Sequence, residues 1–267
     1  MTEASDRFSL FHSRREAQVR EPLGSLALVL TQWIDSEQSV WGVPGTWAPG
    51  PDGGSGLQLT ATAADGITVN GVIVDGTVLL NGPGDDAPTI RFSETHSGTI
   101  IVEDGLYGLR VWDAQSEWVL NYGGIDAYDY DAEWVVTGRW KPNPVGTTLE
   151  VGKQLGSTKY EVIPGEIEFT HGEHTVSLAA IGTGKALQII FADFSNGAET
   201  YSVGRFLFVL PNPDGTVTMD FNLAVLPPCA FSYSFNCPIP PKQNRLPFAV
   251  RAGEKNVLAN DGTLLHH

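Results

Sequence analysis

Short alternating apolar runs, separated by turn residues, recur along almost the whole chain and constrain its fold most strongly. Thirty glycines and seventeen prolines are scattered among 267 residues, as expected of many short strands joined by tight turns. The clearest series begins at Leu57–Ala63 and continues through Asp65-Gly66 and Asp75-Gly76, which suit the positive φ of hairpin turns. We therefore predict an antiparallel meander over this stretch and an all-β fold for the chain.

The remaining runs predict further strands and a single helix. We expect strands at Thr89–Phe92, Thr99–Glu103, Tyr107–Trp112, Trp118–Asn121, Trp134–Lys141, Thr147–Val151, Lys159–Val162, Glu166–Thr170, Thr175–Ala180, Ala186–Ala192, Arg205–Leu210 and Thr216–Asp220. A short N-terminal helix is expected from about Phe8 to Arg20, because Pro22 ends it. Leu26–Ile34 fits a buried strand or a short helix, and 123–131 reads as an acidic, aromatic loop. The pattern is compatible with a mostly antiparallel β-barrel or a two-sheet sandwich.

Charge restricts the partners that the chain can take. Sixteen basic and thirty-one acidic residues give a formal net charge of −15, which repels nucleic-acid phosphates and anionic lipid headgroups. No apolar run approaches the ~20 residues of a spanning helix, and the first residues lack the pattern of a signal peptide. We expect a cytoplasmic protein that binds neither nucleic acid nor membrane. The oligomeric state does not follow from the sequence.

Polar residues in a rigid, proline-rich C-terminal block predict a functional site. Residues 201–255 contain both cysteines and, among apolar neighbours, seven candidate site residues. The candidates for ligand binding are Tyr201, Arg205, Asn222, Asn244 and Arg245, and the candidate proton acceptors are Glu254 and Asp220. Two arginines beside carboxylates suit a small anionic or polar molecule. The alternative is a purely structural pair between Arg205 and the Asp220/Asn222 end of the next strand.

Two further motifs have more than one interpretation. Cys229 and Cys237 lie eight positions apart and fit buried free thiols, a disulfide or, least well, catalysis or metal binding. His171-Gly172-Glu173-His174 resembles a zinc-binding pair but is better explained as an exposed hairpin turn. We expect no metal or cofactor, because no zinc signature, dinucleotide fingerprint or nucleophile elbow occurs.

The C-terminal block resembles a known family. The runs GRFLFV, DGTVTMDFNLAVLPPCAF and CPIPPKQNRLPFAVRAGEK resemble the C-terminal signature of the DUF1684 family, which comprises bacterial and archaeal proteins of unassigned function. FADFSNGAETYSVGRFL, LRVWD and FHSRREAQVREPLGSLAL resemble other segments of that family. The resemblance covers roughly residues 8–255 and implies a single domain over that range. We expect residues 256–267, which show no packing pattern, to form a disordered tail.

The sequence leaves two classes of function open. The first is a protein that binds a small molecule in a pocket formed by the C-terminal block, with or without catalysis. The second is a noncatalytic interaction scaffold, in which the polar residues brace irregular backbone and an exposed tryptophan, Trp41 or Trp47, contacts a partner.

Overall fold

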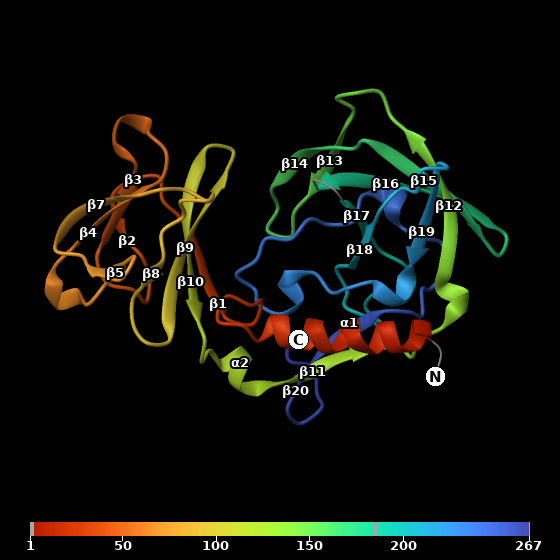
Figure 1. The fold of residues 1–267 in the computed structure, drawn as a ribbon, viewed down its shortest axis with the longest axis horizontal. Coiled ribbons are helices and arrows are strands. Elements are labelled where there is room, and N and C mark those ends of the chain that lie inside the picture. Colours follow the sequence, from red (N-terminus) through yellow and green to blue (C-terminus); the bar gives the residue numbers. More distant parts are fainter. Residues whose placement is uncertain (1–2, 184–185, 267) are drawn as a thin grey trace. The chain divides into compact units, whose positions relative to one another are not determined.

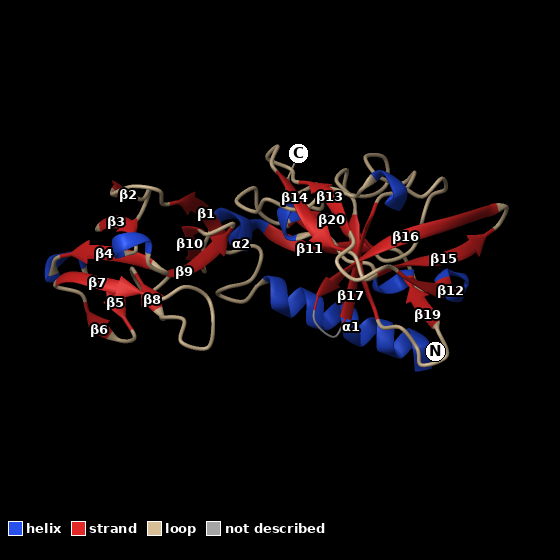
Figure 2. Cartoon of the chain, turned by 90° about the horizontal axis from the view of Figure 1, so that it is seen from above, coloured by secondary structure: helices blue, strands red, loops and turns tan. Residues whose placement is uncertain are grey.

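Antiparallel strands dominate this computed structural model, which describes residues 3–183 and 186–266 (Figure 2). The all-β prediction is therefore confirmed. The predicted N-terminal helix is α1, Glu3–Val19, and Pro22 follows its end. A second, short helix, α2, covers Glu117–Asn121, where a strand was predicted. None of the described helices has the length and hydrophobicity of a bilayer-spanning segment.

The described residues group into two units. Unit 1 consists of the described residues within Met1–Glu16, Tyr122–Phe231 and Asn236–His267, and unit 2 of Ala17–Asn121 and Ser232–Phe235. One boundary between the units falls between Asn121 and Tyr122. That residues 8–255 behave as one cooperative domain remains a prediction.

Unit 1 is built on a six-stranded sheet that nearly closes into a barrel (Figure 1). Its strands, in spatial order, are β18 (Arg205–Val209), β17 (Ala186–Phe191), β16 (His174–Thr183), β15 (Gly165–His171), β12 (Val135–Pro142) and β19 (Thr216–Asp220). The turn after β18 brings the two end strands together, because Pro211 forms a bridge with Val217. Side chains alternate between two clusters: Leu178 and Ile189 belong to one, and Ala179 and Ile190 to the other.

Two strand pairs complete unit 1. They are β13 (Thr148–Gly152) with β14 (Thr158–Val162), and β11 (Tyr122–Ala127) with β20 (Glu254–Ala259). The segment predicted as an acidic loop therefore begins with β11. The C-terminal residues also differ from the expected disordered tail: Leu265 N donates to Val257 O, and His266 contacts the Phe231 carbonyl oxygen. These contacts explain why the C-terminal residues are ordered, although no apolar periodicity predicts that they are.

Unit 2 contains two sheets around an apolar core. One has the order β1 (Leu28–Trp33), β10 (Leu106–Asp113), β9 (His96–Glu103), β8 (Ile90–Arg91), β5 (Thr68–Val69) and β6 (Val72–Ile73). The other has the order β2 (Gln38–Ser39), β3 (Thr46–Pro49), β4 (Leu57–Ala61) and β7 (Gly76–Leu80). Trp47, Leu57, Leu59 and Ile67 lie fully buried between these elements.

The predicted meander over residues 57–80 is wrong in its connections, although its strands are antiparallel. β4 pairs with β7, whereas β5 pairs with β6 and β8 in the other sheet. Asp65 ends a 3-10 turn that Gly66 terminates at φ 69°, so this pair does not connect a hairpin. The β5–β6 hairpin turns at Asn70 and Gly71, both with positive φ.

Candidate functional site

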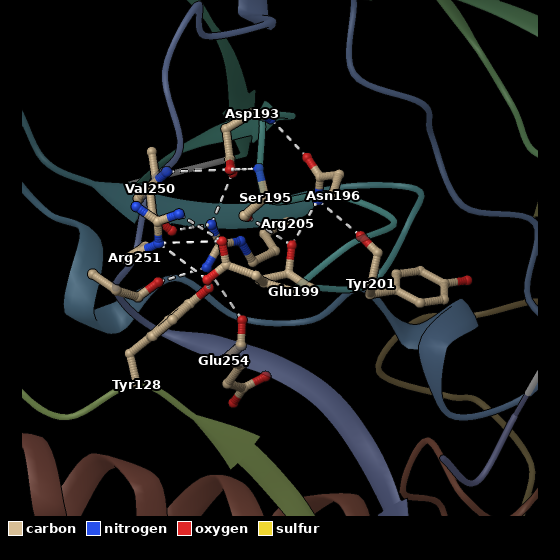
Figure 3. A network of polar contacts seen from close by, with 12 residues as sticks. Tyr128, Asp193, Ser195, Asn196, Glu199, Tyr201, Arg205, Val250, Arg251 and Glu254 are labelled. Atoms are coloured by element: carbon tan, nitrogen blue, oxygen red, sulfur yellow. Dashed lines mark hydrogen bonds and ion pairs between the residues drawn. The ribbon is translucent and has the colours of Figure 1, made fainter.

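Arg205 lies at the centre of a buried polar network in unit 1 (Figure 3). Its fully buried guanidinium donates from Nη2 to Asp193 Oδ2 at 2.8 Å. It also donates to the carbonyl oxygens of Val250, Ala252 and Glu254. A buried guanidinium needs such acceptors, because an uncompensated buried charge is costly. The predicted Arg–Asp pair therefore exists, but its carboxylate is Asp193, and the expected pairing with the Asp220 end of β19 is wrong.

Asp193 also organises the loop between β17 and β18. Its Oδ1 accepts hydrogen bonds from the backbone N–H groups of Ser195 and Val250. Asn196 Oδ1 accepts from the Asp193 N–H, and its Nδ2 donates to Tyr201 O. The carboxylate is satisfied on both oxygens, so this network supports irregular backbone and leaves little capacity for a ligand.

Glu254 is enclosed in a second buried ion pair. Its Oε1 accepts from Arg15 Nε of α1 at 2.9 Å, and its Oε2 accepts from Arg15 Nη2 and from the Leu226 N–H. Gly253 precedes it at φ 78°, where a Cβ would meet the Phe221 and Ala224 carbonyl oxygens at 2.7 and 2.6 Å. The arrangement joins α1 to the start of β20. As a proton acceptor, Glu254 remains a prediction.

The side chains of the two predicted asparagines serve as hydrogen-bond partners of backbone groups. Asn222 bonds both the N–H and the carbonyl of Asp131, and its Nδ2 also donates to Asp220 Oδ1. Asn244 accepts from Ala179 N and donates to the carbonyl oxygens of Ala179 and Ile190. Its amide therefore bridges β16 and β17 beyond the residues at which these strands pair directly. Every side-chain polar group of Asn244 is used within the fold.

The side chains of Tyr201 and Arg245 take no part in this buried network, although the Tyr201 carbonyl oxygen accepts from Asn196. Tyr201 is half-buried, and its hydroxyl donates to Cys229 O at 3.2 Å. Burial, followed by the neighbouring Cys229, raises the pKa of Tyr201. Arg245 is exposed at the end of a 3-10 turn. The structure thus brings Arg205 and the backbone of Glu254 together, but not the predicted set into one cavity.

The two cysteines are adjacent and both buried. Cys237 Sγ accepts a hydrogen bond from the Cys229 N–H at 3.2 Å, and neither forms a disulfide. The Cys237 thiol, by hydrogen bonding, lowers the pKa of Cys229, although desolvation opposes this effect. Of the interpretations open from sequence, buried free thiols describe this state.

Asp220, unlike the buried carboxylates, opens onto a groove of about 610 Å³ in unit 1. The groove is lined by residues of α1 and of the turn that follows β19: Glu3, Ala4, Arg7, Phe8, Phe11, Asp220 and Leu223. Asp220 Oδ1 caps the turn by accepting from the Asn222 N–H. Within the described residues, neither Asp220 Oδ2 nor the exposed Arg7 guanidinium has a hydrogen-bond or ion-pair partner. This groove therefore offers an unpaired cation and an unpaired carboxylate oxygen beside apolar surface.

A sequence profile of known proteins matches this region. The family described as "Protein of unknown function (DUF1684)" matches residues 120–255. The chain belongs to the DUF1684 family. All seven predicted site residues lie inside the matched range, whereas α1 and residues 17–119 lie outside it. The resemblance of residues 8–119 to DUF1684 therefore remains a prediction.

The other comparisons add no function to the DUF1684 assignment. No curated protein matches the chain. A similar solved structure is the solution NMR structure of an uncharacterized protein of Haloarcula marismortui, with 29% identity and a TM-score of 0.42. The similarity covers 49% of this chain and 76% of that chain.

A second cavity of about 610 Å³ lies in unit 2, outside the DUF1684 match. His96 and Thr95 line it, and Thr95 Oγ1 lies 2.9 Å from His96 Nδ1. His96 Nε2 is 3.7 Å from Asp113 Oδ2 across the β9–β10 ladder. At 3.7 Å this contact is longer than a hydrogen bond. We assign Thr95 and His96 to the turn between β8 and β9, where the His96 carbonyl oxygen accepts from the Phe92 N–H.

The His171–His174 motif forms the predicted hairpin turn between β15 and β16. His171 stacks on Trp134 with ring centroids 4.7 Å apart, and Phe248 lies next to both histidines. No group of three His, Cys, Asp or Glu side chains in residues 3–183 and 186–266 is arranged to hold a metal ion.

Sequence reasoning missed two arginines of α1 that complete these sites. Arg7 and Arg15 lie in a helix whose apolar pattern is imperfect. Asp220, which lines the same groove as Arg7, and Glu254, which pairs with Arg15, follow much later in the chain. Asp193 directly follows a very apolar strand, and this placement is typical of a counter-ion for a buried charge. Its pairing with Arg205 requires the β17–β18 register, in which Phe191 lies opposite Arg205.

Proposed function

We propose that unit 1 binds a small polar molecule in the groove between α1 and the turn after β19. The supporting observation is that two groups without a partner among the described residues, the Arg7 guanidinium and Asp220 Oδ2, line one cavity with the apolar side chains of Phe8, Phe11 and Leu223. Ligand sites commonly combine apolar walls with a few convergent polar groups. The proposal keeps the expected ligand class but moves the site from the buried network to the surface beside Asp220.

The side chains that line the groove indicate which kind of ligand would fit. Arg7 would hold an anionic group, because a guanidinium binds carboxylate or phosphate with two parallel hydrogen bonds. Asp220 Oδ2 would accept a hydrogen bond from a hydroxyl or ammonium group on the same molecule. An apolar body between these groups would contact Phe8 and Phe11. Amino acids and hydroxy acids have this combination, and Asp220 is the proton acceptor if chemistry occurs.

A binding assay tests the proposal directly. We would titrate the full chain with a panel of amino and hydroxy acids and with their methyl esters, which lack the anionic group. At least one acid should raise the Tm, and its ester should not. Arg7→Ala should abolish the shift and Asp220→Asn should weaken it, while Arg14→Ala, an exposed arginine outside the groove, should leave it unchanged. Equal shifts for acid and ester, or for wild type and Arg7→Ala, would refute the site.

A noncatalytic interaction domain is the second candidate. The observation that favours it is Trp41, which is 77% exposed in unit 2, since large exposed aromatic side chains are enriched at protein interfaces. Trp47, the other tryptophan considered, is fully buried and unsuited to this role. Loss of a co-purifying partner in Trp41→Ala, with ligand titrations unaffected, would favour the interaction domain over the groove.

A further inference from the structure

Cys229 and Cys237 form an isolated pair of thiols that the proposed groove does not use. Cys229 is 1% exposed and Cys237 is 5% exposed. The 3.2 Å contact between Cys237 Sγ and the Cys229 N–H holds the two residues side by side, although eight positions separate them in sequence. These are the chain's two cysteines, so any disulfide within one molecule must join them.

The backbone around both residues is rigid. Pro228 and Cys229 begin a 3-10 turn, and Pro238 follows Cys237. Proline fixes φ, so the positions of the two cysteines vary little. A disulfide needs Cα atoms within about 7 Å, and the 3.2 Å N–H···S contact brings the two cysteines close to that range. The thiols are therefore positioned for oxidation without a large rearrangement.

The surroundings of Cys229 favour its thiolate. The hydrogen bond from the Cys237 thiol, supported by the Tyr201 hydroxyl, lowers the pKa of Cys229 against the opposing effect of burial. The thiolate is the nucleophilic form of cysteine, so this shift favours Cys229 as an attacking group. Cys237 lies beside it as a thiol able to react with an oxidised sulfur. Close burial admits a small oxidant more readily than a large one.

We propose that Cys229 and Cys237 form a peroxide-responsive dithiol site, in which Cys229 is oxidised first and Cys237 resolves it to a disulfide. The Cys229 thiolate attacks one peroxide oxygen, the O–O bond breaks, and the departing hydroxide takes the proton that Cys229 lost. The resulting sulfenic acid is attacked by Cys237 sulfur, so that an S–S bond forms and the S–O bond breaks. The second hydroxide leaves with the Cys237 proton. Two thiols and one hydrogen peroxide thus give one disulfide and two waters.

The disulfide would add a covalent link across a short segment of the chain. Residues Ser232–Phe235 lie between the two cysteines and belong to unit 2, whereas both cysteines belong to unit 1. Within unit 2, Ser232 Oγ donates to Leu28 O, and Phe235 packs edge-on against Trp112. Oxidation would close residues 229–237 into a ring, which would restrict the backbone of the segment between the two cysteines.

Peroxide treatment of the native full chain tests the site. After addition of equimolar hydrogen peroxide, free thiols should fall from two to none per chain, and peptide mass spectrometry should find Cys229 linked to Cys237. The oxidised chain should unfold at a Tm raised by about 5 °C, because the closed ring restricts the unfolded state. In Cys237→Ser, dimedone should trap a sulfenic acid at Cys229.

Two results would overturn the proposal. The first is a native chain that keeps both thiols under peroxide while the guanidinium-unfolded chain forms the disulfide. The second is dimedone labelling of Cys237 in Cys229→Ser at the rate found for Cys229 in Cys237→Ser, where at least tenfold slower labelling is expected. If either variant fails to fold, differential alkylation of the two cysteines in the wild-type chain measures the same order of reaction.

Discussion

Unit 1 and unit 2 are both built from short antiparallel strands, but they stabilise those strands differently. Unit 2 buries an apolar core around Trp47, and its buried polar residues are the hydroxyls Ser116 and Ser232, each bonded to a carbonyl oxygen. Unit 1 buries the charged side chains Asp193, Arg205 and Glu254. The comparison shows that hydrophobic packing suffices for regular strands, whereas the irregular C-terminal block requires buried ionic and amide groups.

Removing the Arg205 guanidinium should have the largest effect. Arg205→Ala leaves Asp193 charged and buried and leaves three carbonyl oxygens without their donor, so unfolding free energy should fall by about 3–5 kcal/mol. Guanidinium denaturation monitored by tryptophan fluorescence would measure it. Arg251→Ala, which removes an exposed arginine paired with Glu199, is the matched control and should change stability little. If Arg205→Ala changed the free energy of unfolding little but abolished ligand binding, the result would support the originally predicted pocket at Arg205.

Unit 2 should be most sensitive to lost apolar volume. Leu59→Ala opens a cavity beside Trp47 and should cost about 3 kcal/mol, with Leu79→Ala, an exposed leucine on the neighbouring strand, as control. Hydrogen exchange would report which amides lose protection. If the loss spread equally over both units, they would unfold together, as a single domain over residues 8–255 requires.

Asn244→Ala should have an intermediate effect confined to unit 1. The substitution removes three hydrogen bonds that the Asn244 side chain makes with backbone groups of β16 and β17. The buried backbone groups are left unsatisfied, at a cost of about 2 kcal/mol. Amides of Ala179 and of Ala192, which donates to the Asn244 carbonyl, should differ: only the first should lose protection. Asn212→Ala, in the exposed turn after β18, provides the control, and an equal cost there would contradict the bridging role.

Acid should loosen the C-terminal residues, with the smallest effect. Burial lowers the pKa of His266, so its neutral form favours the folded state. Stability from this group is complete above its ordinary pKa of 6.5 and is lost as pH falls through the lower folded value. The protection factor of the Leu265 amide should therefore drop below pH 6.5 in the wild type. In His266→Gln it should not depend on pH in this range, and an unchanged slope would exclude His266 as the cause.

Much of the fold could be predicted, because alternation and turn residues are local signals. β8, β9, β10 and the strands of the barrel fall where apolar runs alternate. Strand partners could not be predicted, because Thr68–Val69 is too short to specify a sheet. α2 was missed because Trp118, Val119 and Leu120 favour a strand, although Ser116 provides a helix cap by accepting from the Val119 N–H.

The candidate site was predictable only in part. Buried charge at Arg205 follows from its apolar neighbours, and the need for an anion follows from desolvation. The anion is Asp193, which reaches Arg205 only because of how the loop between β17 and β18 folds. The groove at Asp220 depends on α1, which is distant in sequence. Local patterns therefore identify which residues need partners, whereas the tertiary structure determines which residues those partners are.

The ion pair between Arg15 and Glu254 has a consequence for synthesis on the ribosome. These residues are 239 positions apart, so at translation rates of about 5–20 residues per second Arg15 is made roughly 10–50 s before its carboxylate. Residues 17–121, the main part of unit 2, emerge complete within that interval. The newly made helix therefore lacks this ion pair until Glu254 has been added.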